Sequence, residues 1–285
     1  MTLKIGTRKS PLALTQAEEI RQRLLAAWPE LQVELVHIVT SGDRFTDTPL
    51  ADIGGKGLFT KEIEDALLAR EVDIAVHSVK DMQTVLPDGL IIGCMPQRED
   101  PRDALIGAAS IADIPPQGIF GTSSLRRSAQ MLMRRPDLKI VPLRGNVETR
   151  LTKIRTGEMQ ATLLARAGLN RLGLMDIPAV TLSMGECLSA VGQGAIGIEC
   201  RAGDTKILER LTALSHRPTE IAVACERAFL RAVDGSCRMP IAGHATVDGT
   251  TLTFEGLIVE SDGTRPRRAK MTGNPADAEA LGLEA

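Results

Sequence analysis

Hydrophobic and polar residues alternate near the start of the chain in segments typical of strands and helices. Residues 3–7 (LKIGT) predict a short buried strand. Ser10 followed by Pro11 predicts a helix start, because the hydroxyl caps free amides and proline fits the first turn. The helix is expected to run to about Trp28, and residues 33–39 (VELVHIV) predict the next strand. A strand, a helix and a strand in this order form the unit from which parallel sheets are built.

The same pattern continues after a polar loop at residues 41–57. Apolar positions at helical spacing predict a helix over residues 58–70, and residues 73–78 (DIAVHS) predict a strand. Another set of alternating strands and helices begins near Asp103. It predicts strands at IFG, LKIVPL and ATLLA, with helices after Ser123 and after Asn146 between them. This succession predicts a second α/β domain.

One more apolar segment, GAIGIEC at residues 194–200, predicts a buried strand that arrives after the second set is complete. We expect it to return to the first sheet, so that the chain crosses twice between two lobes. From about Arg217 the pattern changes to one helix and alternating strands with DGT turns. The layout resembles hinged anion-binding proteins.

The predicted fold class is therefore α/β. It has two lobes like those of periplasmic binding proteins, joined by a double-crossing hinge, and a small α+β C-terminal domain. The expected domains are residues 1–94 with 195–212, residues 100–188 and residues 217–285.

Composition narrows the classes of partner. The 285 residues carry a net charge of −2 with a pI near 6.1, and aromatic residues make up 2% with no tyrosine. This excludes the basic, aromatic-rich surface typical of nucleic-acid binding. The chain has no apolar signal core and no bilayer-length apolar stretch, so we expect a cytoplasmic protein without a membrane partner. We also expect a monomer. Five cysteines without a CxxC pair and scattered histidines predict no metal site.

Arginines occur where strands give way to helices. In open α/β sheets the ligand crevice lies beyond the carboxyl ends of the strands, and helix N-terminal amides there favour anions. A guanidinium binds a carboxylate bidentately, so this placement predicts a ligand with several carboxylate arms. Solvated surface arginines remain the alternative at each position. The arginines are Arg8, Arg126, Arg127, Arg144 and Arg150.

The segment AVHSVKD is a strand whose polar end delivers His77, Ser78, Lys80 and Asp81 together. A carboxylate at the edge of the expected crevice could stabilise cationic charge or transfer a proton. The alternative is an ordinary surface ion pair between Lys80 and Asp81.

Cys237 lies in a Gly-Ser turn, DGSCRMP, where a thiol is expected to be exposed, and Arg238 beside it favours a reactive thiolate. The other cysteines, Cys94, Cys187, Cys200 and Cys225, lie within or beside apolar runs and are expected to be buried. The glycine-rich segments GGKG and VGQGAIG lack the spacing or context of nucleotide-binding loops, and GGKG is expected to be a flexible loop.

Taken together, segments in order along nearly the whole chain resemble the porphobilinogen deaminase (hydroxymethylbilane synthase) family. These are TRKSPLAL, GDRFTDTPL, GGKGLFTKE, DIAVHSVKD, REDPRDA, GTSSLRRSAQ, RRPDL, LRGNVETRL, AGLNRLG, VGQGAIGIEC and GSCRMPI. The combination of GSC, HSVKD and SSLRR is specific. Where the family usually reads Val-Pro after the aspartate, this chain has Met82 and Gln83.

The resemblance implies a transferase of haem biosynthesis that joins four porphobilinogen units head to tail with loss of ammonia. The units are added to a dipyrromethane cofactor that is attached to Cys237 through a thioether, and linear hydroxymethylbilane is released by hydrolysis. It also implies that Asp81 is the catalytic carboxylate, which handles cationic intermediates and ring nitrogens.

The resemblance further implies two sets of binding residues. The cofactor-binding set is Ser78, Lys80, Asp81, Thr122, Ser124, Arg126, Arg127, Arg144 and Gly145, and the substrate-binding set is Arg8, Gln16, Arg144, Arg150 and Arg171.

Two other classes of protein remain as alternatives. A non-catalytic hinged anion-binding protein would share the lobes and the arginines but would need neither Cys237 nor Asp81. A DNA-binding regulator would require a helix-turn-helix module and a basic face, and neither is evident in the sequence.

Overall fold

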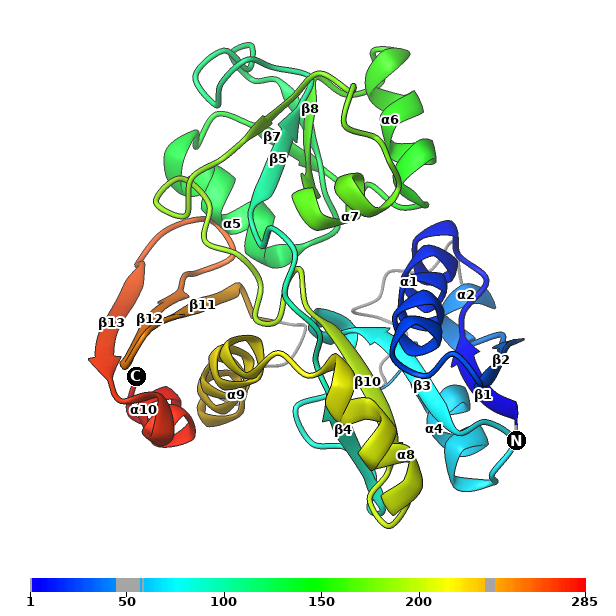
Figure 1. The fold of residues 1–285 in the computed structure, drawn as a ribbon. Coiled ribbons are helices and arrows are strands. Elements are labelled where there is room, and N and C mark those ends of the chain that lie inside the picture. The colour runs from blue at the N-terminus through cyan, green and yellow to red at the C-terminus, as the bar shows by residue number, and fades with distance from the viewer. Residues whose placement is uncertain (1, 45–56, 58, 234–238) are drawn as a thin grey trace. The chain divides into compact units, whose positions relative to one another are not determined.

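The structure is a computed structural model of residues 1–285, and it describes all of them except 1, 45–56, 58 and 234–238 (Figure 1). Cys237 and most of GGKG therefore lie outside the described residues. The chain divides into two compact units, Met1–Glu99 with Ala195–Glu220, and Asp100–Gly194 with Ile221–Ala285.

The first unit is built on a five-stranded sheet in the order β2-β1-β3-β10-β4. Strands β1 (Thr2–Thr7), β2 (Gln32–His37) and β3 (Ile74–Ser78) are parallel. Strand β10 (Ile196–Arg201) is antiparallel to both β3 and β4 (Leu90–Cys94). The predicted return of the segment GAIGIEC to the first sheet is confirmed.

Helices cover both faces of this sheet. Ala17, Ile20 and Leu24 of α1 (Pro11–Ala27) pack against one set of strand residues that includes Ile5 and Val76. Ile63, Ala66 and Leu67 of α4 (Lys61–Leu68) pack against another set that includes Ala75. Shorter elements complete the unit: α2 (Ser41–Arg44), η1 (Val79–Asp81), α8 (Thr205–Leu211) and η2 (Thr212–Leu214).

The sequence prediction for the first helix is confirmed. The Ser10 side chain accepts a hydrogen bond from the Ala13 amide, Pro11 opens the helix and Trp28 caps its end.

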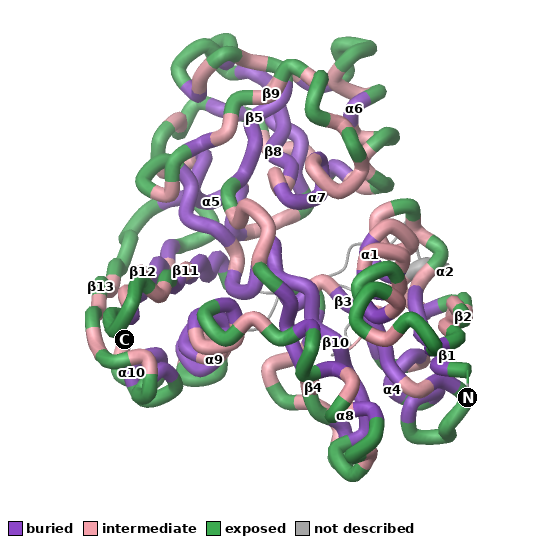
Figure 2. Tube along the Cα trace, in the orientation of Figure 1, coloured by how far each residue is buried: buried purple, intermediate pink, exposed green. Residues whose placement is uncertain are grey.

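The second unit contains a five-stranded sheet in the order β7-β6-β8-β5-β9. Strand β6 (Ile119–Gly121) runs parallel to β7 (Lys139–Val141) and β8 (Ala161–Ala165), whereas β5 (Asp103–Ile106) runs antiparallel to β8 and to β9 (Ala179–Thr181). The helices of this sheet are α5 (Leu125–Arg134), α6 (Val147–Arg155) and α7 (Arg166–Arg171). Figure 2 shows that β8 is buried along most of its length, as is β10 of the first unit.

The C-terminal elements form a separate small α+β domain. Helix α9 (Arg217–Ala232) precedes an antiparallel sheet of β11 (Ile241–Asp248), β12 (Thr251–Ile258) and β13 (Arg267–Gly273). The chain ends in η3 (Pro275–Asp277) and α10 (Ala278–Glu284). The predicted α/β class with a small C-terminal domain is confirmed, and the exact three-domain boundaries stay a prediction. None of the helices in the described part of the chain is long and apolar enough to span a membrane.

Candidate active site

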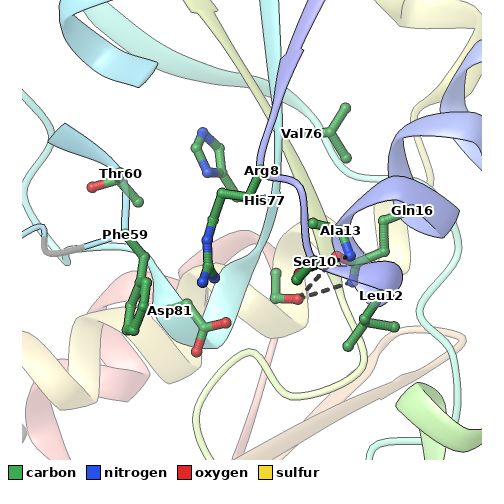
Figure 3. Close-up of a pocket in the computed structure, with 11 residues that line it drawn as sticks. Arg8, Ser10, Leu12, Ala13, Gln16, Phe59, Thr60, Val76, His77 and Asp81 are labelled. Carbon is green, nitrogen blue, oxygen red and sulfur yellow. Dashed lines mark hydrogen bonds between the residues drawn. The ribbon is translucent and has the colours of Figure 1, made fainter. Parts of the chain in front are cut away.

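The carboxyl end of β3 opens into a cavity of the first unit (Figure 3). The cavity has an empty volume of about 410 Å³, which includes space open to solvent. Strand β3 ends at Ser78, and the turn η1 that follows carries Asp81. The lining residues are Arg8, Ser10, Leu12, Ala13, Gln16, Phe59, Thr60, Val76, His77, Ser78 and Asp81. Both helix-covered faces of the sheet therefore contribute polar groups to one cavity.

Arg8 enters this cavity from the loop between β1 and α1. Its guanidinium carbon lies 4.2 Å from the centroid of the Phe59 ring, which is the geometry of a cation–π contact. The side chains of Arg8 and Asp81 point toward one another (Figure 3). A cation and a carboxylate in one cavity suit a ligand that carries both a negatively and a positively charged group.

Gln16 and Ser78 form a polar pair on the α1 side of the cavity. The Gln16 side-chain amide donates to Ser78 Oγ at 2.9 Å. Gln16 is buried on α1, so its contact holds the Ser78 hydroxyl at the strand end. Lys80, the next predicted residue, is exposed on η1 and does not line the cavity.

A buried cluster of charges occupies the second unit. Arg126 Nη2 lies 2.8 Å from Asp103 Oδ2, and Arg127 Nη2 lies 2.6 Å from Asp103 Oδ1. The Ser124 side chain caps α5 by accepting a hydrogen bond from the Arg127 amide. Arg126 and Arg127 lie in the first turn of this helix, and their side chains extend from it to Asp103. Burial alone would raise the pKa of Asp103, but the two guanidinium groups outweigh it and hold that pKa well below its usual range.

This cluster carries more positive than negative charge, since two guanidinium groups face one carboxylate. All three side chains are at most 8% exposed. Among the described residues, Arg127 Nε has no hydrogen-bond partner. Buried charge without a partner is costly, so the cluster is suited to an anionic group such as a carboxylate arm.

The remaining predicted residues also lie in the second unit. Arg144 follows β7, and Arg150 Nε of α6 donates to the Gly145 carbonyl oxygen at 2.9 Å. Gly145 has a φ of 103°, and a Cβ there would come within 2.7 Å of Thr149, so the turn requires glycine. Thr122 Oγ1 accepts from the Ser124 amide, and Arg171 Nη2 donates to the Gly194 carbonyl oxygen.

The predicted site residues thus fall into two groups, one on each unit. The structure brings Arg8, Gln16, Ser78 and Asp81 to one cavity, and it brings Arg126 and Arg127 to one carboxylate. Sequence reasoning missed Asp103, although an aspartate beginning an apolar segment is a detectable signal.

The cysteines of the described residues are buried thiols with raised pKa values. Cys94, Cys187, Cys200 and Cys225 are free and buried, as the sequence predicts. Burial raises the pKa of Cys94, Cys187 and Cys225 to about 12 and that of Cys200 to about 11. Where the structure describes the chain, no three His, Cys, Asp or Glu residues are grouped to hold a metal ion.

The fold and these side chains define an α/β protein that presents a charged cavity on one unit and a buried arginine pair on the other. Residues 3–209 match a family model described as porphobilinogen deaminase, dipyromethane cofactor binding domain, and residues 220–285 match the porphobilinogen deaminase C-terminal domain. The chain belongs to the porphobilinogen deaminase family. The alternative of a non-catalytic binding protein is not favoured.

A curated relative, the porphobilinogen deaminase of Syntrophotalea carbinolica, is 52% identical over 284 residues, which cover 99% of this chain and 90% of the relative. Among solved structures, the effector-binding domain of a BenM variant matches with a TM-score of 0.46 at 15% identity, covering 75% of this chain and 92% of that one. The alkanesulfonate-binding protein SsuA from Xanthomonas axonopodis pv. citri matches with a TM-score of 0.41 at 16% identity, covering 82% and 75%.

Proposed function

We propose that this protein acts as a porphobilinogen deaminase, a transferase that makes linear hydroxymethylbilane from four porphobilinogen units. The observation that carries the mechanism is the cavity at the end of β3, where Asp81 lies with Arg8, Gln16 and Ser78. Porphobilinogen bears carboxylate arms and an aminomethyl group, so its charges complement an arginine and an aspartate in one site.

Asp81 is the proposed catalytic carboxylate. When ammonia leaves porphobilinogen, positive charge develops on the methylene carbon and the pyrrole ring. A carboxylate already held in the cavity stabilises this charge more strongly than water does, because it does not have to reorient. Gln16 and Ser78 orient the substrate beside it.

The cofactor's proposed attachment residue is Cys237, which lies outside the described residues. When bound, dipyrromethane supplies a covalent primer for the growing chain. The excess positive charge at Arg126 and Arg127, with the unpartnered Nε of Arg127, fits the carboxylate arms of such a group. The other proposed cofactor contacts are Ser78, Lys80, Asp81, Thr122, Ser124, Arg144 and Gly145.

The substrate's carboxylate arms are proposed to bind Arg8, Arg144, Arg150 and Arg171. Arg8 and Arg144 follow the carboxyl ends of β1 and β7, whereas Arg150 lies on α6 and Arg171 ends α7. Their guanidinium groups can hold several arms in fixed directions through bidentate contacts. We further propose three domains with the boundaries given above, and a cytoplasmic monomer that binds no nucleic acid.

The test of this function is Asp81→Asn, which keeps the side chain's size and removes its charge. Turnover of cofactor-loaded enzyme should fall by about 100-fold or more, corresponding to about 3 kcal/mol of lost stabilisation. The thermal midpoint should hardly change, because Asp81 is exposed. Asp88→Asn removes an exposed charge from the same segment and should leave turnover normal.

Intact mass confirms cofactor loading before each comparison, so that failed priming is not mistaken for failed catalysis. Near-normal turnover in loaded Asp81→Asn, with a small loss of stability, would instead identify a surface ion pair with Lys80.

A further inference from the structure

Strand β3 presents successive side chains to opposite faces of its sheet. Ser78 faces the α1 side, where it meets Gln16. Ala75 packs with α4, so His77, two residues further on, lies on the α4 side. His77 also lines the cavity (Figure 3). His77 therefore belongs both to the cavity lining and to the α4 side of the sheet.

A buried carboxylate meets the imidazole on that face. In the register of β10 and β3, Glu199 lies opposite Ala75, which makes it the diagonal neighbour of His77. His77 Nε2 lies 3.0 Å from Glu199 Oε2, and the two side chains are 5% and 0% exposed. Helix α4 contributes a second buried carboxylate, Glu64.

These carboxylates have few compensating contacts. Among the described residues, Oε1 of Glu64 and both oxygens of Glu199 lack a hydrogen-bond partner, and the contact of Glu199 Oε2 with His77 Nε2 has ion-pair distance without hydrogen-bond geometry. A bare buried carboxylate is costly unless it is neutralised or paired. Burial raises the pKa of Glu64; the Thr60 side chain opposes this by hydrogen bonding, and the neighbouring Glu199 carboxylate adds to the rise. The 3.0 Å approach of His77 Nε2 to Glu199 Oε2 is the contact that offsets this cost for Glu199.

His77 is the basic side chain that lies within ion-pair distance of Glu199. Arg201, also on β10, donates to the Leu67 and Val72 carbonyl oxygens and to Asp204. On α4, Asp65 is exposed and negative, and on the cavity side Arg8 stacks on Phe59. Asp81, the remaining charged residue of the cavity lining, is an acid.

We propose that His77 binds a carboxylate arm of the substrate through Nδ1 and that Glu199 is a positioning residue that holds the imidazole ring in place for this contact. Glu199 lies beside Nε2, so Nδ1 is the ring nitrogen that remains to face a ligand. Because it names a contact to the proposed substrate, this inference rests on the proposed function.

The experiment is a double-mutant cycle of His77→Gln and Glu199→Gln, both made in the Asp81→Asn background so that turnover is slow. The dissociation constant of porphobilinogen is measured by calorimetry on cofactor-loaded protein. Each single change should weaken binding by about tenfold, the loss expected for a charge-assisted hydrogen bond. The double variant should be no weaker than either single one, because Glu199 acts only through His77.

Asp65→Asn is the matched control, since it removes one carboxylate charge from the neighbouring helix at an exposed position. It should leave binding unchanged. Independent, additive effects of the two changes would overturn the positioning role, and unchanged binding in His77→Gln would overturn the contact itself.

A second comparison does not depend on Glu199→Gln folding. The His77→Asn variant places an amide where Nδ1 lies, whereas the His77→Gln variant places one where Nε2 lies. The His77→Asn variant should therefore bind porphobilinogen more tightly than the His77→Gln variant, and the opposite order would contradict the proposal. Failure of the wild-type protein to form hydroxymethylbilane would sink the proposed function while leaving these binding comparisons intact.

Discussion

Asp103→Asn should destabilise the second unit strongly. Asp103 is fully buried between Arg126 and Arg127, at 2.8 and 2.6 Å. Asparagine keeps the size of the side chain, but it loses the charge and turns an amide donor toward one guanidinium. Breaking a buried pair in this way typically costs about 3 to 5 kcal/mol. For a unit of this size the thermal midpoint should fall by roughly 6 to 20 °C.

The assay is thermal unfolding at neutral pH beside Glu148→Gln, which breaks the exposed pair of Glu148 with Arg155. That control should cost less than about 1 kcal/mol. The pKa of Asp103 is lowered in the folded state, so its stabilisation is present at neutral pH and is lost only as pH falls below the unfolded value of about 3.9. The difference in thermal midpoint between the wild-type protein and Asp103→Asn should therefore be constant from pH 6 to 8. Equal midpoints for Asp103→Asn and Glu148→Gln would refute the account of a buried ionic cluster.

Two further predictions concern ligand binding and thiol chemistry. Replacing Arg126 or Arg127 by leucine should weaken binding of the carboxylated substrate or primer by roughly 1.5 to 3 kcal/mol, so that less chain becomes loaded with cofactor, measured by the loaded fraction in intact mass. Unchanged loading and unchanged substrate requirement in both variants would remove these arginines from the site. At pH 8 the buried thiols stay protonated, because their pKa values are raised to about 11 or 12. A thiolate-selective reagent should therefore label only Cys237, and it should do so only in protein that lacks the cofactor. Rapid labelling of a second cysteine in the folded protein would contradict the assigned burial.

The sequence predicts best what short-range chemistry determines. The cap at Ser10 and the start at Pro11 are local signals, and both appear in the structure. The return of β10 to the first sheet follows from an apolar segment that arrives after a complete second set of strands and helices.

Features that depend on partners far along the chain are harder to predict. Strand β13 (Arg267–Gly273) has no fully buried residue, and its alternation rests on Ala269 and Met271 between polar residues, so the pattern is weak and the strand exists through its pairing with β12. The Arg126–Asp103 contact joins two distant segments, which no sequence period reveals. Glu199 is different, because an acidic residue inside the apolar run GAIGIEC is a local sign of a buried polar contact.

The most direct test of the central claim is the intact mass of the denatured chain before and after incubation with porphobilinogen. The account predicts a wild-type chain heavier than its sequence by one dipyrromethane, with further additions of pyrrole units after incubation. It predicts the bare sequence mass and no hydroxymethylbilane for Cys237→Ser, because serine is a much poorer nucleophile near neutral pH. A wild-type chain that forms hydroxymethylbilane at its unmodified mass, or a Cys237→Ser chain that keeps the full adduct, would contradict it.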